Sequence, residues 1–187
     1  MKERKTSCLV LFSGGMDSTA CIQYYLNQGF HVEGIFIDYG QVARKKEFYS
    51  ANNIASYYGI ELDYHEFSTS QMFFQGEIKG RNAFLVFATL LSYPEFHGIL
   101  SLGVHSGVPY YDCSEPFVKE INRILDGYTG GQIILDTPFL KWDKKMIYIY
   151  CKDNNVPIHL TYSCENGGDE PCGTCRSCLD RRALNVC

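Results

Sequence analysis

The fold of this chain is decided by the stretch Ser13-Gly14-Gly15-Met16-Asp17-Ser18, which directly follows the apolar run Cys8-Leu9-Val10-Leu11-Phe12. A buried strand that leads into two glycines and then a helix brings backbone N–H groups and the positive end of the helix dipole together. Glycine permits close approach of the backbone, serine hydroxyls can donate to phosphate oxygens, and Asp17 can ligate Mg²⁺, which prefers oxygen ligands. The stretch therefore predicts a site for phosphate or pyrophosphate.

The motif differs from two well-known glycine-rich phosphate loops. No Gly-Lys-Ser/Thr follows the glycines, so it is not a Walker loop, and the G-x-G-x-x-G pattern of dinucleotide-binding folds is absent. It resembles instead the PP-loop of the ATP pyrophosphatases, which cleave ATP to AMP and pyrophosphate and adenylate a carboxylate or carbonyl oxygen. A Gly-Gly turn before a serine-capped helix is the alternative that these residues leave open.

Length and composition are those of one ordinary globular domain. The chain has 187 residues, of which 45% are hydrophobic and 20% charged, and we expect a single domain over residues 1–187. The net charge of −4 gives no general attraction for nucleic acid, and no apolar stretch approaches the roughly 20 residues that span a bilayer. The charged start of the chain precedes too short an apolar run for a signal peptide, so we expect a cytoplasmic protein without membrane partners.

Strand and helix patterns alternate along the chain. Strands are expected over residues 7–12, 31–37, 61–67, 99–104 and 132–135, and helices over residues 18–27, 43–58, 81–96, 114–125 and 143–154. This alternation indicates an α/β fold with a doubly wound, parallel five-stranded sheet covered on both faces. In such sheets ligands bind beyond the carboxyl ends of the strands, so polar residues there are expected to share one site. These residues are Ser13, Asp38, His105 and Thr137.

Four of the nine cysteines gather near the end of the chain, as Cys164, Cys172, Cys175 and Cys178. Closely spaced thiolates can chelate one ion from a tight turn, and the glycines nearby permit such turns, so the spacing matches a structural, tetrahedral zinc site in a lobe over about residues 160–187. An iron–sulfur cluster or two disulfides are the alternatives. Nothing in the sequence indicates export, which favours metal over disulfides.

Taken together, the two ends of the chain resemble the 7-cyano-7-deazaguanine synthase family, nitrile-forming enzymes of queuosine-type pathways. The resemblance spans roughly residues 7–181. Its motifs are residues 13–18, Asp38-Tyr39-Gly40-Gln41, Arg81-Asn82, Gly103-Val104-His105, Tyr111-Asp112-Cys113, Thr137-Pro138-Phe139, Lys144 and Ser163-Cys164-Glu165-Asn166-Gly167-Gly168 with the three last cysteines of the cluster. The resemblance implies a PP-loop fold of the adenine nucleotide alpha hydrolase type with a C-terminal Cys₄ zinc lobe.

The resemblance also implies an ATP-dependent carbon–nitrogen ligase. ATP is expected to adenylate the carboxylate of 7-carboxy-7-deazaguanine with release of pyrophosphate. Ammonia then displaces AMP to form an amide, and a second activation dehydrates the amide to a nitrile. The implied cofactors are ATP, Mg²⁺ and structural Zn²⁺, and the family commonly forms homodimers.

Each motif residue takes an expected role from this resemblance. Asp17, Lys144 and Asp112 are expected to be catalytic, Asp17 through Mg²⁺ and Lys144 by offsetting charge as pyrophosphate leaves. The residues expected to bind ATP are Ser13, Gly14, Gly15, Asp17, Ser18, Asp38 and Gln41. Those expected to bind the deazapurine are Arg81, Asn82, His105, Tyr111 and Asp112, with Tyr110 or Tyr111 stacking on the base and Asp112 accepting from its N–H edge.

The chain departs from the family pattern at three places. The stretch between Phe67 and Arg81 is much shorter than in the family, the loop at His105 is shortened, and Met146 stands where the family has a glutamate. Shorter loops open the site, and closure over a reactive adenylate often decides its fate.

Two other functions therefore remain open at this point. One keeps the adenylation but transfers the deazaguanine acyl group to a protein amine, as is thought for short relatives in antiviral gene clusters. The other is a PP-loop RNA-modifying module. Such proteins typically need a catalytic cysteine, for which Cys113 is the candidate, and the acidic net charge argues against an RNA partner.

Overall fold

A computed structural model of the chain describes residues 6–67, 70–74 and 76–186. Five parallel strands form one sheet, and they are β1 (Ser7–Leu11), β2 (His31–Asp38), β3 (Leu62–Glu66), β4 (Gly98–Leu102) and β5 (Ile133–Asp136). The strand order is β3-β2-β1-β4-β5, so the direction of winding reverses at β1. This is the expected doubly wound sheet, and its switch point lies at the carboxyl end of β1, directly before the glycine-rich loop.

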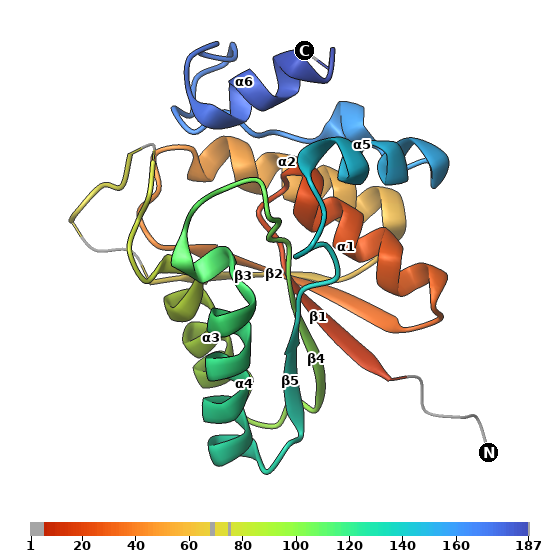
Figure 1. The fold of residues 1–187 in the computed structure, drawn as a ribbon, viewed down its shortest axis with the longest axis vertical. Coiled ribbons are helices and arrows are strands. Elements are labelled where there is room, and N and C mark those ends of the chain that lie inside the picture. Colours follow the sequence, from red (N-terminus) through yellow and green to blue (C-terminus); the bar gives the residue numbers. More distant parts are fainter. Residues whose placement is uncertain (1–5, 68–69, 75, 187) are drawn as a thin grey trace.

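Helices cover both faces of the sheet (Figure 1). They are α1 (Met16–Asn27), α2 (Arg44–Tyr58), α3 (Arg81–Ser92), α4 (Glu115–Thr129), α5 (Lys144–Asp153) and α6 (Arg176–Ala183), with 3₁₀ turns at Tyr111–Cys113 and Ile158–Leu160. Helices α1, α2 and α5 pack on one face, and α3 and α4 pack on the other. No helix in the described part of the chain is long and apolar enough to cross a membrane.

The alternation of side chains along β1 explains why this strand is apolar throughout. Cys8 and Val10 pack with the α1, α2 and α5 side, whereas Leu9 and Leu11 pack with the α3 and α4 side. Because β1 is central and both of its faces are buried, polar residues are excluded from either face. The continuous apolar run that identified this strand is therefore a consequence of its place in the sheet.

The elements match their expected ranges except at a few ends. Helix α3 ends at Ser92 rather than at residue 96, because the residue before Pro94 is disfavoured in helical conformation. Helix α4 continues past residue 125 to Thr129 and ends at Gly130, whose φ of 59° is the left-handed conformation typical of a helix end.

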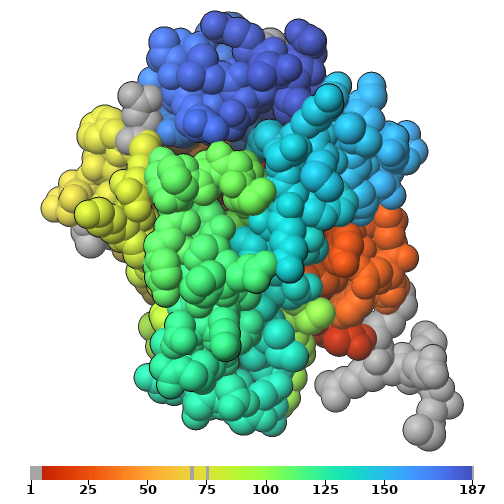
Figure 2. Space-filling model, in the orientation of Figure 1, coloured from red at the N-terminus to blue at the C-terminus, as the bar shows by residue number. Residues whose placement is uncertain are grey.

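The C-terminal lobe (residues 160–186) contains α6 and lies beyond the carboxyl ends of the strands (Figure 1). Figure 2 shows it in blue, packed against the rest of the molecule. Its first residues contact the glycine-rich loop: the Tyr162 N–H donates to the Gly14 carbonyl oxygen at 3.0 Å. The Ser50 hydroxyl of α2 lies 2.9 Å from that oxygen and 2.6 Å from the Leu160 carbonyl oxygen. The lobe is thus attached directly to the predicted phosphate site.

Candidate active site

A cavity of about 320 Å³ lies at the carboxyl ends of β1, β2 and β4, where the strand order reverses. Small-molecule sites in proteins fall roughly between 300 and 1,000 Å³. The cavity is walled by the loop after β1, the first turns of α1, α2, α3 and α5, and the C-terminal lobe. Its position is the one in which open α/β sheets bind ligands.

Two glycines shape the end of this cavity that lies at the glycine-rich loop. A Cβ at Gly14, whose φ is +73°, would lie 2.6 Å from the Glu47 carbonyl oxygen, so only glycine lets the loop pack on α2. A Cβ at Gly103 would come within 2.8 Å of the Ser18 backbone nitrogen, so this glycine keeps the start of α1 clear. The N-terminus of α1 is therefore free to face an anion in the cavity.

Asp17 and Lys144 form an ion pair in the cavity wall. Asp17 lies in the first turn of α1 and Lys144 is the first residue of α5, and the Lys144 Nζ lies 2.6 Å from both carboxylate oxygens. This contact joins the starts of the two helices, although its partners are 127 positions apart in the chain. A carboxylate and an ammonium group are thereby held together beside the helix N-terminus that would bind phosphate.

His105 lies next to this pair. Its Nε2 is 3.9 Å from Asp17 Oδ2, and its Nδ1 accepts from the Gly107 N–H at 3.0 Å, which leaves the proton of a neutral ring on Nε2. Burial lowers the pKa of His105 against the opposing effect of Asp17, and Lys144 lowers it further. His105 is therefore a neutral hydrogen-bond donor at neutral pH.

The start of α3 forms a second wall. Asn82 is 1% exposed, its Nδ2 donates to the Asp112 carbonyl oxygen at 3.1 Å, and its N–H donates to Asp112 Oδ2 at 3.4 Å. Burial alone would lower the pKa of Arg81, but Tyr39 and Asp112 outweigh it and the pKa lies above its ordinary value. Asp112 thus holds the first turn of α3 and the charge of Arg81 in place.

Most of the predicted site residues line the cavity. They are Ser13, Gly15, Asp17, Ser18, Gln41, Arg81, Asn82, His105 and Lys144. Gly14 lies behind the loop against α2, and its role is to let the loop adopt its shape. Four other residues expected at the site do not line the cavity, and they are Asp38, Tyr111, Asp112 and Thr137.

Asp38 is buried and its carboxylate is engaged within the protein. It accepts from the Gly40 N–H at 2.8 Å and from the Tyr64 hydroxyl at 2.8 Å, and it lies 3.4 Å from Arg44 Nε. Its position at the end of β2 turns the side chain toward β3 rather than into the cavity. Asp38 therefore shapes the turn that leads to Gln41, which does line the cavity.

The aromatic residue of the loop after β4 that faces the cavity is Tyr110. Tyr111 is 63% exposed and packs edge-on against Phe117 of α4, because it begins a 3₁₀ turn that directs it outward. Of the two tyrosines considered for stacking, the structure places Tyr110 at the cavity.

Cys113 also lines the cavity, but its thiol is not activated. Burial raises the pKa of Cys113 to about 11, and Asp112 raises it as well. A thiol with this pKa is protonated at neutral pH and is a poor nucleophile. This finding counts against the cysteine chemistry expected of an RNA-modifying module.

Several polar lining residues were not expected at the cavity from the sequence, among them Glu47, Tyr162, Glu165 and Arg176. In the sequence, Glu165 was noted only as part of the cysteine motif. Its Oε1 accepts from the Ser177 N–H and hydroxyl at 3.2 and 2.9 Å, and its Oε2 accepts from the Gly76 N–H at 3.2 Å. Arg176 donates to the Gly107 carbonyl oxygen at 3.1 Å. The lobe thereby holds both shortened loops of the site.

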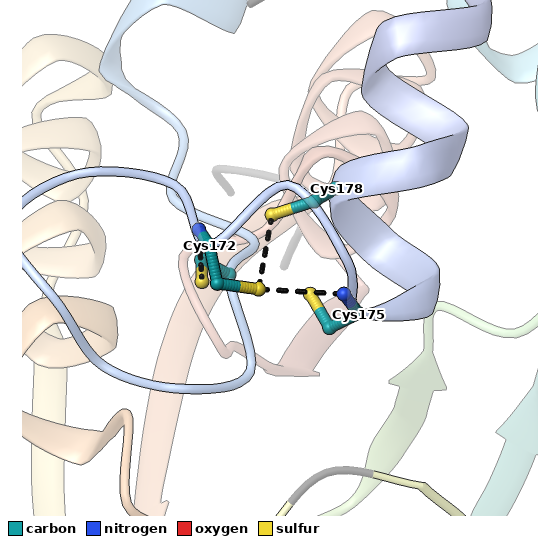
Figure 3. Close-up of side chains that lie close together, drawn as sticks. Cys172, Cys175 and Cys178 are labelled. Atoms are coloured by element: carbon teal, nitrogen blue, oxygen red, sulfur yellow. Dashed lines mark hydrogen bonds between the residues drawn. The ribbon is translucent and has the colours of Figure 1, made fainter.

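The four cysteines of the lobe form one cluster, of which Figure 3 shows Cys172, Cys175 and Cys178. Their sulfur atoms and that of Cys164 all lie within 4.8 Å of one another, and all four are free thiols. The Cys172 and Cys178 sulfurs are 3.9 Å apart. A tetrahedral ion with metal–sulfur bonds of about 2.3 Å requires about 3.8 Å between sulfurs, so the cluster can hold one metal ion.

Known proteins resemble this chain in sequence and in fold. The family model described as "Queuosine biosynthesis protein QueC" matches residues 7–77 and 68–185. The chain is 31% identical to the 7-cyano-7-deazaguanine synthase of Prochlorococcus marinus (strain MIT 9301), covering 98% of this chain and 95% of that protein. It is 28% identical to the protein of that name from Acetivibrio thermocellus, covering 92% of this chain and 90% of that protein.

Among solved structures, NMN synthetase from Francisella tularensis matches with a TM-score of 0.54, and the match covers 99% of this chain and 74% of the synthetase chain. At 16% sequence identity this is a similarity of fold.

Proposed function

The chain belongs to the family of the queuosine biosynthesis protein QueC, and we propose on this basis that it converts 7-carboxy-7-deazaguanine to 7-cyano-7-deazaguanine with ATP and ammonia. The observation that carries the proposal is the Asp17–Lys144 pair beside the N-terminus of α1, in a cavity that also contains Arg81. A phosphate cradle and a cation for an anionic acid in one cavity are what a reaction between ATP and a carboxylate requires, and this arrangement supports the proposal.

The phosphate end of the cavity suits the departure of pyrophosphate. The N–H groups at the start of α1 and the hydroxyls of Ser13 and Ser18 donate to phosphate oxygens. Lys144 offsets the charge that develops as pyrophosphate leaves, and the neutral His105 adds an Nε2–H donor. The carboxylate of Asp17 and the two hydroxyls are oxygen ligands of the kind that Mg²⁺ prefers, and Mg²⁺ bound there would offset phosphate charge.

The other end of the cavity suits the deazapurine acid. Arg81 can bind the carboxylate through two parallel N–H donors and hold it in line with the α-phosphorus. Tyr110 offers its ring for stacking, and Asp112 positions Arg81 and Asn82 from behind. A carboxylate oxygen attacks the α-phosphorus and pyrophosphate leaves; ammonia then attacks the acyl carbon and AMP leaves. A second activation removes the amide oxygen to give the nitrile.

We infer that the cysteine cluster holds zinc in a structural role. Four thiolates complete a tetrahedral shell and leave no position for a substrate. The ion would hold the lobe that supplies Tyr162, Glu165 and Arg176 to the cavity wall, as part of one domain with the sheet. A homodimer remains a prediction from the resemblance, and a cytoplasmic location remains a prediction from the sequence.

Mass spectrometry of the products tests the proposed function. The zinc-loaded protein is incubated with 7-carboxy-7-deazaguanine, Mg²⁺-ATP and ammonium, and nitrile with AMP is the expected result. AMP with a deazaguanine adduct on a protein amine would instead identify the conjugating enzyme. Absence of AMP would refute the proposed substrate.

A further inference from the structure

Glu47 is a carboxyl group in the cavity wall for which the reaction above has no role. It lies in the first turn of α2 and lines the cavity. Within the described part of the chain, its side chain accepts a hydrogen bond from Gln41, whose Nε2 donates to Oε2 at 3.2 Å. The amide of Gln41 is itself fixed, since Nε2 also donates to the Ile37 carbonyl oxygen and Oε1 accepts from the Tyr39 N–H. Glu47 is therefore held in one orientation.

The surroundings of Glu47 place it between the two ends of the cavity. Its backbone contacts Gly14 of the phosphate loop, and its carboxylate interacts electrostatically with Arg81, the proposed ligand of the substrate carboxylate. An acyl adenylate joins these two ends, so its acyl carbon would lie in the part of the cavity that Glu47 faces.

The charged and titratable groups near Glu47 carry an excess of negative charge. They are Arg81 of α3, Tyr39 and Asp38 at the end of β2, and Tyr162 and Glu165 of the C-terminal lobe. Asp38 is already paired with Arg44, so Glu47, Glu165 and Asp112 are three carboxyl groups that share Arg81. An ammonium ion beside Glu47 would restore the balance of charge.

Amidation requires a base at this point. At neutral pH ammonia is present mainly as ammonium, whose nitrogen has no lone pair with which to attack, so ammonium must lose a proton in the site. A general base works best when its pKa lies near the operating pH. Burial raises the pKa of Glu47 to about 7, while Gln41 and Arg81 oppose the shift.

We propose that Glu47 binds ammonium in the cavity and removes its proton, so that neutral ammonia attacks the acyl adenylate; this inference rests on the proposed function. The N–H bond of ammonium breaks, its electron pair stays on nitrogen, and the proton passes to the Glu47 carboxylate. The nitrogen bonds to the acyl carbon, the bond from that carbon to the AMP oxygen breaks, and AMP leaves with the electron pair. The nitrogen loses its second proton to water, and Glu47 returns its own proton to water before the next cycle.

The test compares wild type, Glu47→Gln and Glu61→Gln. Glu61 is an exposed glutamate outside the cavity, so its variant is the matched control. Adenylation is measured as exchange of pyrophosphate into ATP without ammonium. Amide formation is measured with ammonium across neutral to alkaline pH, and hydroxamate formation is measured with hydroxylamine, which is mostly neutral at neutral pH and needs no base.

Glu47→Gln is expected to adenylate as wild type does and to form hydroxamate at the wild-type rate, whereas amide formation from ammonium falls roughly 100-fold at neutral pH. This deficit should shrink toward alkaline pH, where free ammonia becomes abundant, and Glu61→Gln should behave as wild type. Amide formation at the wild-type rate in Glu47→Gln, or an equal loss of adenylation, would overturn the assignment. Absence of adenylation in the wild type would refute the proposed function itself and the assignment with it.

Discussion

At the scale of single residues, two adjacent lysines at the start of α5 offer a matched comparison. Lys144 reaches Asp17, whereas Lys145 is exposed and does not line the cavity. In the proposed reaction, removal of the Lys144 charge would leave the developing charge of pyrophosphate without this cation. We expect Lys144→Met to lower the rate of pyrophosphate exchange roughly 100-fold to 1,000-fold, and Lys145→Met to leave it unchanged. Equal rates in the two variants would remove Lys144 from the reaction.

The raised pKa of Glu47 also predicts how the stability of the fold depends on pH. Its pKa is raised by burial from 4.5 to about 7, so between these values the unfolded chain has lost a proton that the folded chain retains. The free energy of unfolding therefore falls as the pH rises through this window, by about 3 kcal/mol, because the folded state then has to bury a charged carboxylate. Glu47→Gln has no charge to bury and should exceed the wild type in stability by this amount above neutral pH.

Urea unfolding at acidic and at mildly alkaline pH measures this difference. The two proteins should be equally stable at a pH below the ordinary pKa of a glutamate. A gap of the same size at both pH values would mean that packing rather than ionisation distinguishes the variants, and that Glu47 is not held in a poorly solvated position.

At the scale of elements, the packing of the phosphate loop on α2 is tested by two glycines with similar backbone conformation. Gly14 (φ +73°) and Gly29 (φ +80°) both adopt the left-handed region, but a Cβ at Gly29 meets nothing within 4 Å. Gly29→Ala should therefore cost only the backbone strain, about 1–2 kcal/mol. Gly14→Ala must also push α2 away and should cost about 3–5 kcal/mol in the free energy of unfolding. Similar losses in the two variants would show that the loop does not depend on this close contact.

Elements were predictable where one local feature determines them. The apolar run of β1 follows from burial on both faces, and Ser114 caps α4 by accepting from the Phe117 N–H. The direction of a side chain at a strand end is not local. Asp38 turns toward Tyr64 of the neighbouring strand and Tyr111 turns outward in a 3₁₀ turn, and neither follows from residue type.

Glu47 could not be predicted as a cavity residue from the sequence for a related reason. It enters the site because α2 packs on Gly14, a contact between residues 33 positions apart whose basis is the missing Cβ of a glycine. By contrast, Asp17 and Lys144 were identified from motifs, although their direct contact depends on the meeting of α1 and α5.

At the scale of the whole molecule, the C-terminal lobe links the cysteine cluster to the cavity. Tyr162 contacts Gly14, Glu165 holds Gly76, and Arg176 holds Gly107. Removal of the proposed zinc by a chelator should therefore abolish adenylation while circular dichroism still reports most of the helical content, and added zinc should restore activity. Cys175→Ser should lose bound zinc, whereas Cys8→Ser, in the buried strand β1, should retain it by elemental analysis. Full activity in metal-free protein would separate the lobe from the site.

The central claim is that this cavity transfers AMP to a carboxylate, and an isotope label tests it most directly. The protein is supplied with 7-carboxy-7-deazaguanine that carries oxygen-18 in its carboxyl group, together with Mg²⁺-ATP and ammonium, and the AMP is weighed by mass spectrometry. Because the acyl carbon releases the oxygen that attacked the α-phosphorus, AMP should contain one labelled oxygen for each adenylation of the carboxylate. AMP without label would mean that water or another group attacks ATP, and it would contradict the account.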